Sequence, residues 1–334
     1  MTVFGYSLLC EQRGPRELVA DAVAAEDAGF DFAVISDHYF PWLEAQGHSP
    51  NVWPVLGAVA AATERMPLMT YVTCPTMRYH PAVVAQKAAT VALLAGDERF
   101  CLGLGAGENL NEHVIGRGWP PVNVRHEMLS EAIEIIGELF AGGYVNRKGE
   151  HYRVDSAKLW DVPDAGVPIA VAVSGEQSVR AFAPVADAMV AVEPLPELVQ
   201  GFDAAAGVTL PKIGQQPISW GEDRDDAVAR AHEQFRWFAG GWKVNAELPG
   251  PAAFAAATQF VTPDDVAEAF SCGPEVGAHV EALRPFVDAG FTHVAVVQVG
   301  GETQPGFLAF AERELLPALR EEYGKPDAGP IKVR

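Results

Sequence analysis

Two short stretches of the chain place proton-handling side chains directly after apolar runs. Asp37 and His38 follow the run that begins at Phe30, and Glu108 follows the run "FCLGLGAG", which begins at Phe100. A histidine exchanges a proton near neutral pH, and a carboxylate can hold or release a second one. These residues predict proton-transfer chemistry if the fold brings the two stretches together.

Three glycines precede Glu108, at positions 103, 105 and 107. Because glycine has no side chain, such a run lets a flat ligand approach the backbone closely. The spacing is GxGxG, whereas the NAD-binding loop of a Rossmann domain has the spacing GxGxxG and an acidic partner for the ribose. The run therefore argues against an NAD site of that type.

Apolar runs typical of strands alternate with helical patterns along the chain, which is the signature of βα units. Helices are expected at 15–30, with Gly29 as the stop, and at 81–96, 125–143, 225–241 and 279–291. Strands are expected at 2–9, 32–38, 68–74, 100–107, 167–175, 187–194, 212–220 and 293–299. This number of strands predicts an α/β fold of the (β/α)8 TIM-barrel type, in which Asp37, His38 and Glu108 would share the carboxyl-terminal face.

Two segments interrupt the alternation, at about 144–163 and 240–264. The first has the pattern of a small hairpin, and the second is a longer excursion. In a TIM barrel, such insertions extend the βα loops around the ligand site. We therefore expect one TIM-barrel domain over residues 1–334, with substrate specificity in these loops.

Composition excludes several other classes of protein. The chain has 24 basic and 44 acidic residues, a formal charge of −20, which opposes binding to nucleic acid or to anionic membranes. The four cysteines lie far apart and form no metal-binding spacing, so reduced thiols and no metal site are expected. The amino-terminal residues lack the pattern of a secretory signal, and a soluble cytoplasmic protein is expected.

The motifs "SDHYFPW", "TCPTMRYHPAVVAQ", "GLGAGENLNE" and "HYRVDSAKLWDVPDAGVPIAVAVSG" together resemble the F420-dependent glucose-6-phosphate dehydrogenase family of the luciferase-like superfamily. The resemblance implies a homodimer that binds the deazaflavin coenzyme F420 across the barrel face. It places His38 and Glu108 at the catalytic histidine and glutamate, which handle the two protons of hydride transfer, and Trp42 at the active-site tryptophan.

The same resemblance implies a set of cofactor contacts. Asp37, Thr76, Gly107 and Asn111 match positions near the deazaflavin ring, and Tyr71-Val72 lies where the superfamily often has a non-proline cis peptide beneath that ring. Ser174, Gly175 and Glu176 match the backbone cradle of the cofactor phosphate. Here the chain has Ser-Gly-Glu in place of the expected Gly-Gly-Pro.

The substrate region departs from the family pattern. The sugar-phosphate enzymes hold their dianionic substrate with two lysines and an arginine. This chain has Leu195 at the first lysine, Glu268, Ala269 and Phe270 near the arginine, and only Lys243 near the second lysine. The region also contains Phe235, Trp237, Phe238, Trp242, Phe254 and Phe260, which form either a helix core or an apolar pocket.

We therefore expect an F420-dependent oxidoreductase that acts on an uncharged alcohol, or on the matching carbonyl compound. Three alternatives stay open at this point. The chain could be a glucose-6-phosphate dehydrogenase, an FMN-dependent luciferase-like monooxygenase, or a barrel that binds a flavin without catalysis.

Overall fold

The computed structural model describes residues 2–96, 98–324 and 331–334. Its centre is a closed barrel of eight parallel strands, in which each strand pairs with the next one and the last pairs with the first. The strands are β1 (Val3–Leu8), β2 (Phe32–Ile35), β3 (Leu68–Thr70), β4 (Phe100–Leu104), β7 (Ile169–Ala172), β8 (Ala188–Val190), β9 (Lys212–Trp220) and β11 (His293–Gln298). The predicted (β/α)8 fold is confirmed.

Each barrel strand lies where the apolar runs predicted it, but most of them end earlier. The run 68–74 becomes a strand only to Thr70, and the run 100–107 only to Leu104. Residues just beyond these strands turn into the loops at the carboxyl-terminal end of the barrel. The polar residues that follow each run therefore lie in loops that a rigid strand positions.

The inside of the barrel is filled by side chains that point inward from the strands. The interior cluster comprises Val3, Phe32, Val34, Met69, Cys101, Ala170, Ala188, Val190, Ile213 and Ala295. Gly5 lies opposite Phe32 in the β1–β2 register, and a Cβ on Gly5 would lie 2.5 Å from the Phe32 ring. The phenyl ring therefore occupies the space that glycine leaves, and the barrel is packed rather than hollow at this level.

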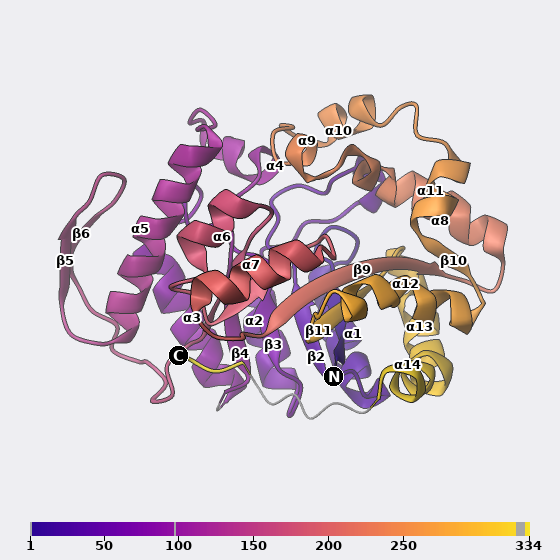
Figure 1. The fold of residues 1–334 in the computed structure, drawn as a ribbon, viewed down its shortest axis with the longest axis horizontal. Helices are drawn as coiled ribbons and strands as arrows, with labels where there is room; N and C mark the ends of the chain where they lie inside the picture. Colours follow the sequence, from indigo (N-terminus) through magenta and orange to yellow (C-terminus); the bar gives the residue numbers. More distant parts are fainter. Residues whose placement is uncertain (1, 97, 325–330) are drawn as a thin grey trace.

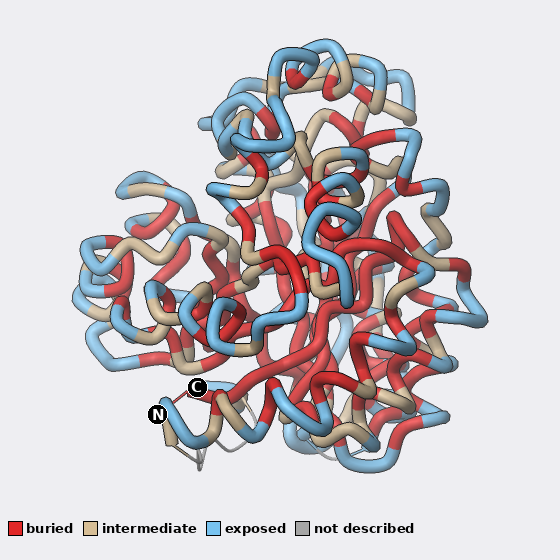
Figure 2. Tube along the Cα trace, turned by 90° about the vertical axis from the view of Figure 1, so that its right-hand side faces the viewer, coloured by how far each residue is buried: buried red, intermediate tan, exposed pale blue. Residues whose placement is uncertain are grey.

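Helices surround the barrel and bury their inner faces against it (Figures 1 and 2). The main helices are α1 (Pro15–Ala28), α2 (Val52–Ala62), α3 (Pro81–Ala95), α5 (Val122–Phe140), α6 (Glu176–Phe182), α7 (Pro196–Ala206), α8 (Arg224–Phe235), α12 (Val276–Asp288), α13 (Gln304–Phe310) and α14 (Leu316–Tyr323), with a π-helical turn η5 (Ala311–Leu315) between the last two.

Local sequence explains the ends of α1. Pro15 occupies the first turn, where its missing N–H costs no hydrogen bond, and Gly29 ends the helix with φ +92°. A left-handed residue at this position lets the Gly29 N–H bond back to the carbonyls of Ala25 and Glu26. The predicted stop at Gly29 is confirmed.

Two loop regions extend from the barrel. A two-stranded antiparallel sheet, β5 (Val145–Lys148) and β6 (Arg153–Ala157), occupies the segment where a hairpin was expected, and it projects beside α5 (Figure 1). After α8 the chain forms a group of short helices that we call the lid. The lid comprises η3 (Arg236–Gly240), α9 (Trp242–Asn245), α10 (Pro251–Ala257) and α11 (Pro263–Ala269).

The lid lies at the end of the barrel opposite the two chain termini (Figure 1). It leads into β10 (Ser271–Gly273), a short strand that pairs with β9 and was not predicted. The remaining short elements are η1 (Glu44–Gln46), α4 (Asn109–Glu112), η2 (His113–Ile115) and η4 (Gly301–Thr303).

All four cysteines are buried and free. Across the described residues, no helix combines the length and the apolar character needed to cross a membrane.

Candidate active site

His38 lies between two carboxylates at the carboxyl-terminal end of the barrel. Its Nδ1 atom is 3.3 Å from Oε1 of Glu11, and its Nε2 atom is 3.4 Å from Oε2 of Glu108. Nδ1 is also 3.2 Å from the carbonyl oxygen of Phe40. Because two acceptors face Nδ1, we place a proton there, which leaves Nε2 of neutral His38 free to accept another.

Glu11 lies outside the motifs from which the site was predicted. It follows β1 at the same barrel end, and its side chain is only 2 % exposed. Its Oε2 atom accepts a hydrogen bond from the hydroxyl of Ser36, whose oxygen accepts one from the backbone N–H of Cys10. Both carboxylate oxygens of Glu11 thus have a partner, His38 for Oε1 and Ser36 for Oε2. The signal that could have found it is a polar residue directly after the first apolar run.

Glu108 is largely enclosed beside His38, and this environment sets its protonation. Burial raises the pKa of Glu108, and the nearby charge of Glu11 raises it further. The charges of His38 and Arg78 and a hydrogen bond from Asn111 act in the opposite direction, but the pKa stays raised. Glu108 therefore keeps its proton to a higher pH than an exposed glutamate and is suited to donate it.

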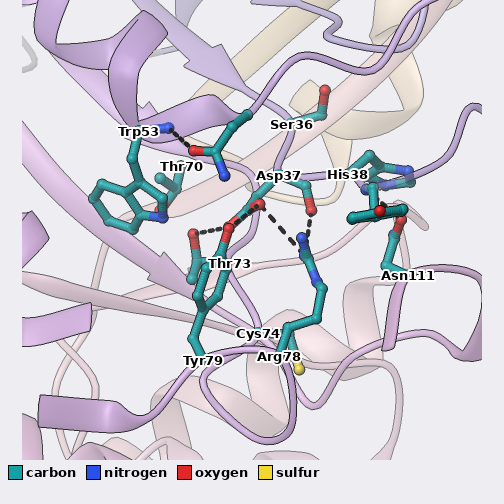
Figure 3. A network of polar contacts seen from close by, with 12 residues as sticks. Ser36, Asp37, His38, Trp53, Thr70, Thr73, Cys74, Arg78, Tyr79 and Asn111 are labelled. Carbon is teal, nitrogen blue, oxygen red and sulfur yellow. Dashed lines mark hydrogen bonds and ion pairs between the residues drawn. The ribbon is translucent and has the colours of Figure 1, made fainter. Parts of the chain in front are cut away.

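The side chains of Asp37 and His38 point in different directions although they are neighbours in sequence (Figure 3). Asp37 is 3 % exposed and accepts hydrogen bonds from the hydroxyls of Thr73, at 2.8 Å, and Tyr79, at 3.3 Å. Arg78 contacts the same carboxylate at 3.4 Å. Asp37 therefore anchors the end of β2, and His38 faces the cavities.

Two cavities meet at His38 and Glu108. The first, which we call the glycine-loop cavity, has a volume of about 140 Å³ and runs from His38 past the glycines toward α5 and α6. Its walls include six of the predicted cofactor residues, namely Asp37, Tyr71, Val72, Gly107, Asn111 and Ser174.

Three other predicted cofactor residues lie away from its walls. Thr76 is buried, with its hydroxyl 2.9 Å from Sγ of Cys74. Gly175 caps α6, and Glu176 points outward and pairs with Arg180.

The backbone of the glycine loop is closely packed against the loop after β3. A Cβ on Gly105 would lie 2.6 Å from a methyl of Val72, and one on Gly107 would lie 2.5 Å from Sγ of Cys74. Gly107 also has φ +88°. Side chains are therefore excluded at both positions, and the backbone of Gly105 and Gly107 itself lines the cavity. The Tyr71–Val72 peptide bond is cis, as expected.

The far end of the glycine-loop cavity has unused hydrogen-bonding capacity. Among the described residues, Nε of Arg125 and Nδ1 of His126 are buried atoms without a partner, and both residues line the cavity. Arg125 uses its other nitrogens to bond Glu247 and the carbonyl of Pro120. Unpaired buried polar atoms are costly, so this end suits a ligand with anionic or carbonyl oxygens.

The second cavity, which we call the aromatic cavity, has a volume of about 160 Å³ and lies under the lid. Trp42 stacks on Trp237 of the lid, with ring centroids 4.1 Å apart and planes 8° apart, and lies 4.9 Å from His38. The five residues shared with the glycine-loop cavity are His38, Tyr71, Glu108, Val192 and Trp242.

Among the described residues that line the aromatic cavity, none is a lysine or an arginine. Lys243 is exposed on α9 and outside the wall, and Leu195 caps α7. Glu268 and Ala269 are exposed on α11, and Phe270 is buried. The acidic residues of the wall are Glu11, Glu108 and Glu193.

Four of the six aromatic residues that were considered for an apolar pocket line the cavity, namely Phe235, Trp237, Phe238 and Trp242. The other two do not line it, and Phe254 agrees with the alternative of a core residue. Phe254 packs edge-on against Trp42 at 5.0 Å and is fully buried behind it. Phe260 is 86 % exposed. An aromatic residue in a helical pattern does not reveal which side of the lid it faces.

Glu127, Glu150 and His151 form the one group of described side chains with metal-ligand spacing. None of the three lines either of the two cavities.

Comparison with known proteins gives consistent matches over nearly the whole chain. The luciferase-like monooxygenase family model matches residues 2–293. An F420-dependent glucose-6-phosphate dehydrogenase of Nakamurella multipartita is 36% identical over 96% of this chain and 98% of the relative. The corresponding protein of Microbacterium testaceum is 35% identical over the same shares.

Among solved structures, an F420-dependent secondary alcohol dehydrogenase in complex with an F420–acetone adduct superposes with a TM-score of 0.87 and 27% identity. The match covers 96% of this chain and all of that one. A coenzyme F420-dependent tetrahydromethanopterin reductase of Methanopyrus kandleri has a TM-score of 0.72 at 20% identity, a likeness of fold alone.

Proposed function

This chain belongs to the luciferase-like family, among its F420-dependent glucose-6-phosphate dehydrogenases and related oxidoreductases, and from that premise we propose that it transfers a hydride between an uncharged alcohol and coenzyme F420. One observation carries the proposal: His38, flanked by Glu11 and Glu108, lies where the two cavities meet. One cavity then holds the cofactor, and the other holds the substrate.

The glycine-loop cavity fits F420. Its glycine wall suits a ring system, and the unpaired nitrogens of Arg125 and His126 suit oxygens of the cofactor tail. Residues placed to hold the ring are Asp37, Tyr71, Val72, Gly107 and Asn111, and Ser174 is placed to hold the tail. We assign no contact to Thr76, Gly175 or Glu176, because none of them lines the cavity.

Each residue around the junction has a distinct part. Bound F420 supplies the hydride acceptor, or the donor in the reverse direction. His38 takes the hydroxyl proton on Nε2 as the carbinol carbon gives up a hydride, and Glu11 stabilises the imidazolium that forms. Glu108 holds a second proton at the junction of the cavities, because its pKa is raised mainly by burial. Trp42 packs beside His38 and limits the positions open to the substrate.

The aromatic cavity favours an alcohol without a phosphate. A sugar phosphate carries nearly two negative charges, and binding it here would remove water from those charges without a cation in return. Glu193 adds a negative charge to the wall instead. The similar secondary alcohol dehydrogenase structure also supports a neutral substrate. Glucose 6-phosphate is the alternative substrate, which the names of the curated relatives favour.

The test measures loss of the oxidised F420 absorption with a panel of neutral secondary alcohols and with glucose 6-phosphate. We expect higher kcat/KM for at least one neutral alcohol than for glucose 6-phosphate. The opposite ranking would assign the chain to the sugar-phosphate enzymes. Titration with F420 and FMN separates the monooxygenase alternative, for which FMN binds at least as tightly. Absence of turnover with every compound would leave only a binding role.

The resemblance also leads us to propose a homodimer, which light scattering of the purified protein tests.

A further inference from the structure

Two buried carboxylates beside the glycine-loop cavity share one guanidinium. Arg78, in the loop after β3, lies with NH2 3.4 Å from Oδ1 of Asp37 and with Nε 3.0 Å from Oε1 of Glu112. The side chains of Arg78, Asp37 and Glu112 are 7 %, 1 % and 0 % exposed. Figure 3 shows the guanidinium of Arg78 directed at Asp37.

Arg78 makes one further hydrogen bond to each of the two segments. Its NH2 group donates to the carbonyl of Asp37 at 3.0 Å, and its own backbone N–H donates to Oε2 of Glu112 at 2.7 Å. Asp37 precedes His38 at the end of β2, whereas Glu112 ends α4, the helix that Glu108 precedes. The guanidinium therefore joins the segment that carries His38 to the segment that carries Glu108.

Asn111 makes a second link between the same two segments. Its Oδ1 atom accepts hydrogen bonds from the backbone N–H groups of Tyr39, at 2.8 Å, and Phe40, at 3.3 Å, and its Nδ2 donates to Glu108 at 2.9 Å. The amide of Asn111 carries no charge, so it cannot neutralise a buried carboxylate. Without Arg78, the carboxylates of Asp37 and Glu112 would be left buried without a cation, and either protonation or separation of the two segments would relieve that cost.

We propose that Arg78 is a positioning residue for catalysis: it holds the ends of β2 and β4 together and so sets the spacing between His38 and Glu108. The inference rests on the proposed function. The competing explanation is that Arg78 only neutralises two carboxylates for stability. A stability role changes the melting temperature, whereas a positioning role also changes kcat and its pH dependence.

The charge of Arg78 gives a direction to that pH dependence. Burial is the main cause of the raised pKa of Glu108; Glu11 also raises the pKa, whereas His38 and Arg78 lower it. Removing the guanidinium charge therefore raises the pKa of Glu108 further. Removing the negative charge of Glu112 leaves Arg78 less compensated and lowers the pKa of Glu108. The two changes should move the pH limb that reports Glu108 in opposite directions.

The experiment compares R78M, R78K and E112Q with the wild type in F420 reduction by a neutral alcohol between pH 5 and pH 10. We expect R78M and R78K to lower kcat by about 10-fold or more while KM stays within about 3-fold, because the lost contacts position the proton-transfer groups. The alkaline limb of the kcat–pH profile should move to higher pH by about one unit in R78M and to lower pH in E112Q. Affinity for F420, followed by fluorescence titration across the same pH range, gives a readout that does not depend on turnover.

R99K is the matched control. Arg99, which precedes β4, bonds Thr63, Ala95 and Met66 and lines neither of the two cavities. Its replacement should lower the melting temperature without moving the pH profile. If the variants at Arg78 do not fold, E112Q decides the question, because it leaves Arg78 paired with Asp37.

An unchanged kcat and pH profile in a folded variant at Arg78 or in E112Q would overturn the inference. Failure of the proposed function would be recognised separately, as an absence of wild-type turnover with any alcohol.

Discussion

Replacement of Glu11 by glutamine offers a direct test of how His38 is activated. The change removes one negative charge and keeps the size of the side chain, and the amide oxygen can still accept the hydrogen bond from Ser36. Oε1 of Glu11 lies 3.3 Å from Nδ1 of His38. Two unit charges at that separation attract each other by about 5 kcal/mol in a medium of effective dielectric constant ~20.

Only part of that energy should appear in the rate. The imidazole carries only a fraction of its final charge in the transition state, so the full attraction is not at stake there. If E11Q loses about half of this attraction in the transition state, the activation barrier rises by about 2–3 kcal/mol, and kcat falls by about 30- to 150-fold. The affinity for F420 should change little, because Glu11 lines the aromatic cavity and not the glycine-loop cavity.

The assay is steady-state F420 reduction with a neutral alcohol, combined with fluorescence titration of F420 and thermal unfolding. E193Q provides the control, because it makes the same substitution in the wall of the same cavity, whereas the carboxylates paired with His38 in the described part of the chain are Glu11 and Glu108. We expect this control to retain turnover within about 3-fold. If E11Q keeps more than half of the wild-type kcat while it folds and binds F420, the assignment of Glu11 to the stabilisation of His38 is wrong.

Three further outcomes are expected. His38→Ala should lower kcat by about 10²–10⁴-fold with nearly unchanged F420 affinity, and a variant that keeps half of the activity would remove His38 from the mechanism. Glu193→Lys should raise kcat/KM for glucose 6-phosphate relative to a neutral alcohol by about 10-fold. The control Glu197→Lys, on α7 outside the cavity, should not change this ratio. Equal effects of the two substitutions would disprove a local role for Glu193. Glu108→Gln should raise the melting temperature by about 1–3 °C at pH 8 but not at pH 4. A carboxyl group whose pKa is raised in the folded state stabilises that state at low pH, and it loses this contribution as the pH rises through the folded pKa. A difference that grows toward low pH would contradict the raised pKa of Glu108.

The barrel could be predicted from the sequence because its strands are buried on both faces. Such strands appear as continuous apolar runs, and the first polar residues after each run mark the end that carries the site. Asp37, His38 and Glu108 were found in this way. Glu11 occupies the equivalent place after β1, but a single glutamate after "SLLC" has no neighbouring motif to mark it.

The lid could not be predicted to the same depth. Trp237 stacks on Trp42 across nearly two hundred residues of sequence, and no local pattern encodes that contact. The sequence pattern around Phe254 and Phe260 is compatible with a buried or an exposed side chain at both positions. In the structure Phe254 is buried, and Phe260 is almost fully exposed. Strand β10 was missed because three residues, Ser-Cys-Gly, form no apolar run. These features depend on how distant segments pack, and only the three-dimensional structure reveals them.

The two cavities take most of their walls from different parts of the chain. Residues 37–126 and 172–192 build most of the glycine-loop cavity, whereas residues 235–245 supply a third of the residues that line the aromatic cavity. If the proposed function holds, substitutions in the lid should alter substrate choice without changing the cofactor site, which gives evolution a short, contiguous stretch in which new specificities can arise. The same separation makes this stretch a natural unit for grafting between relatives, with Trp242 as the lid residue that must remain compatible with both cavities.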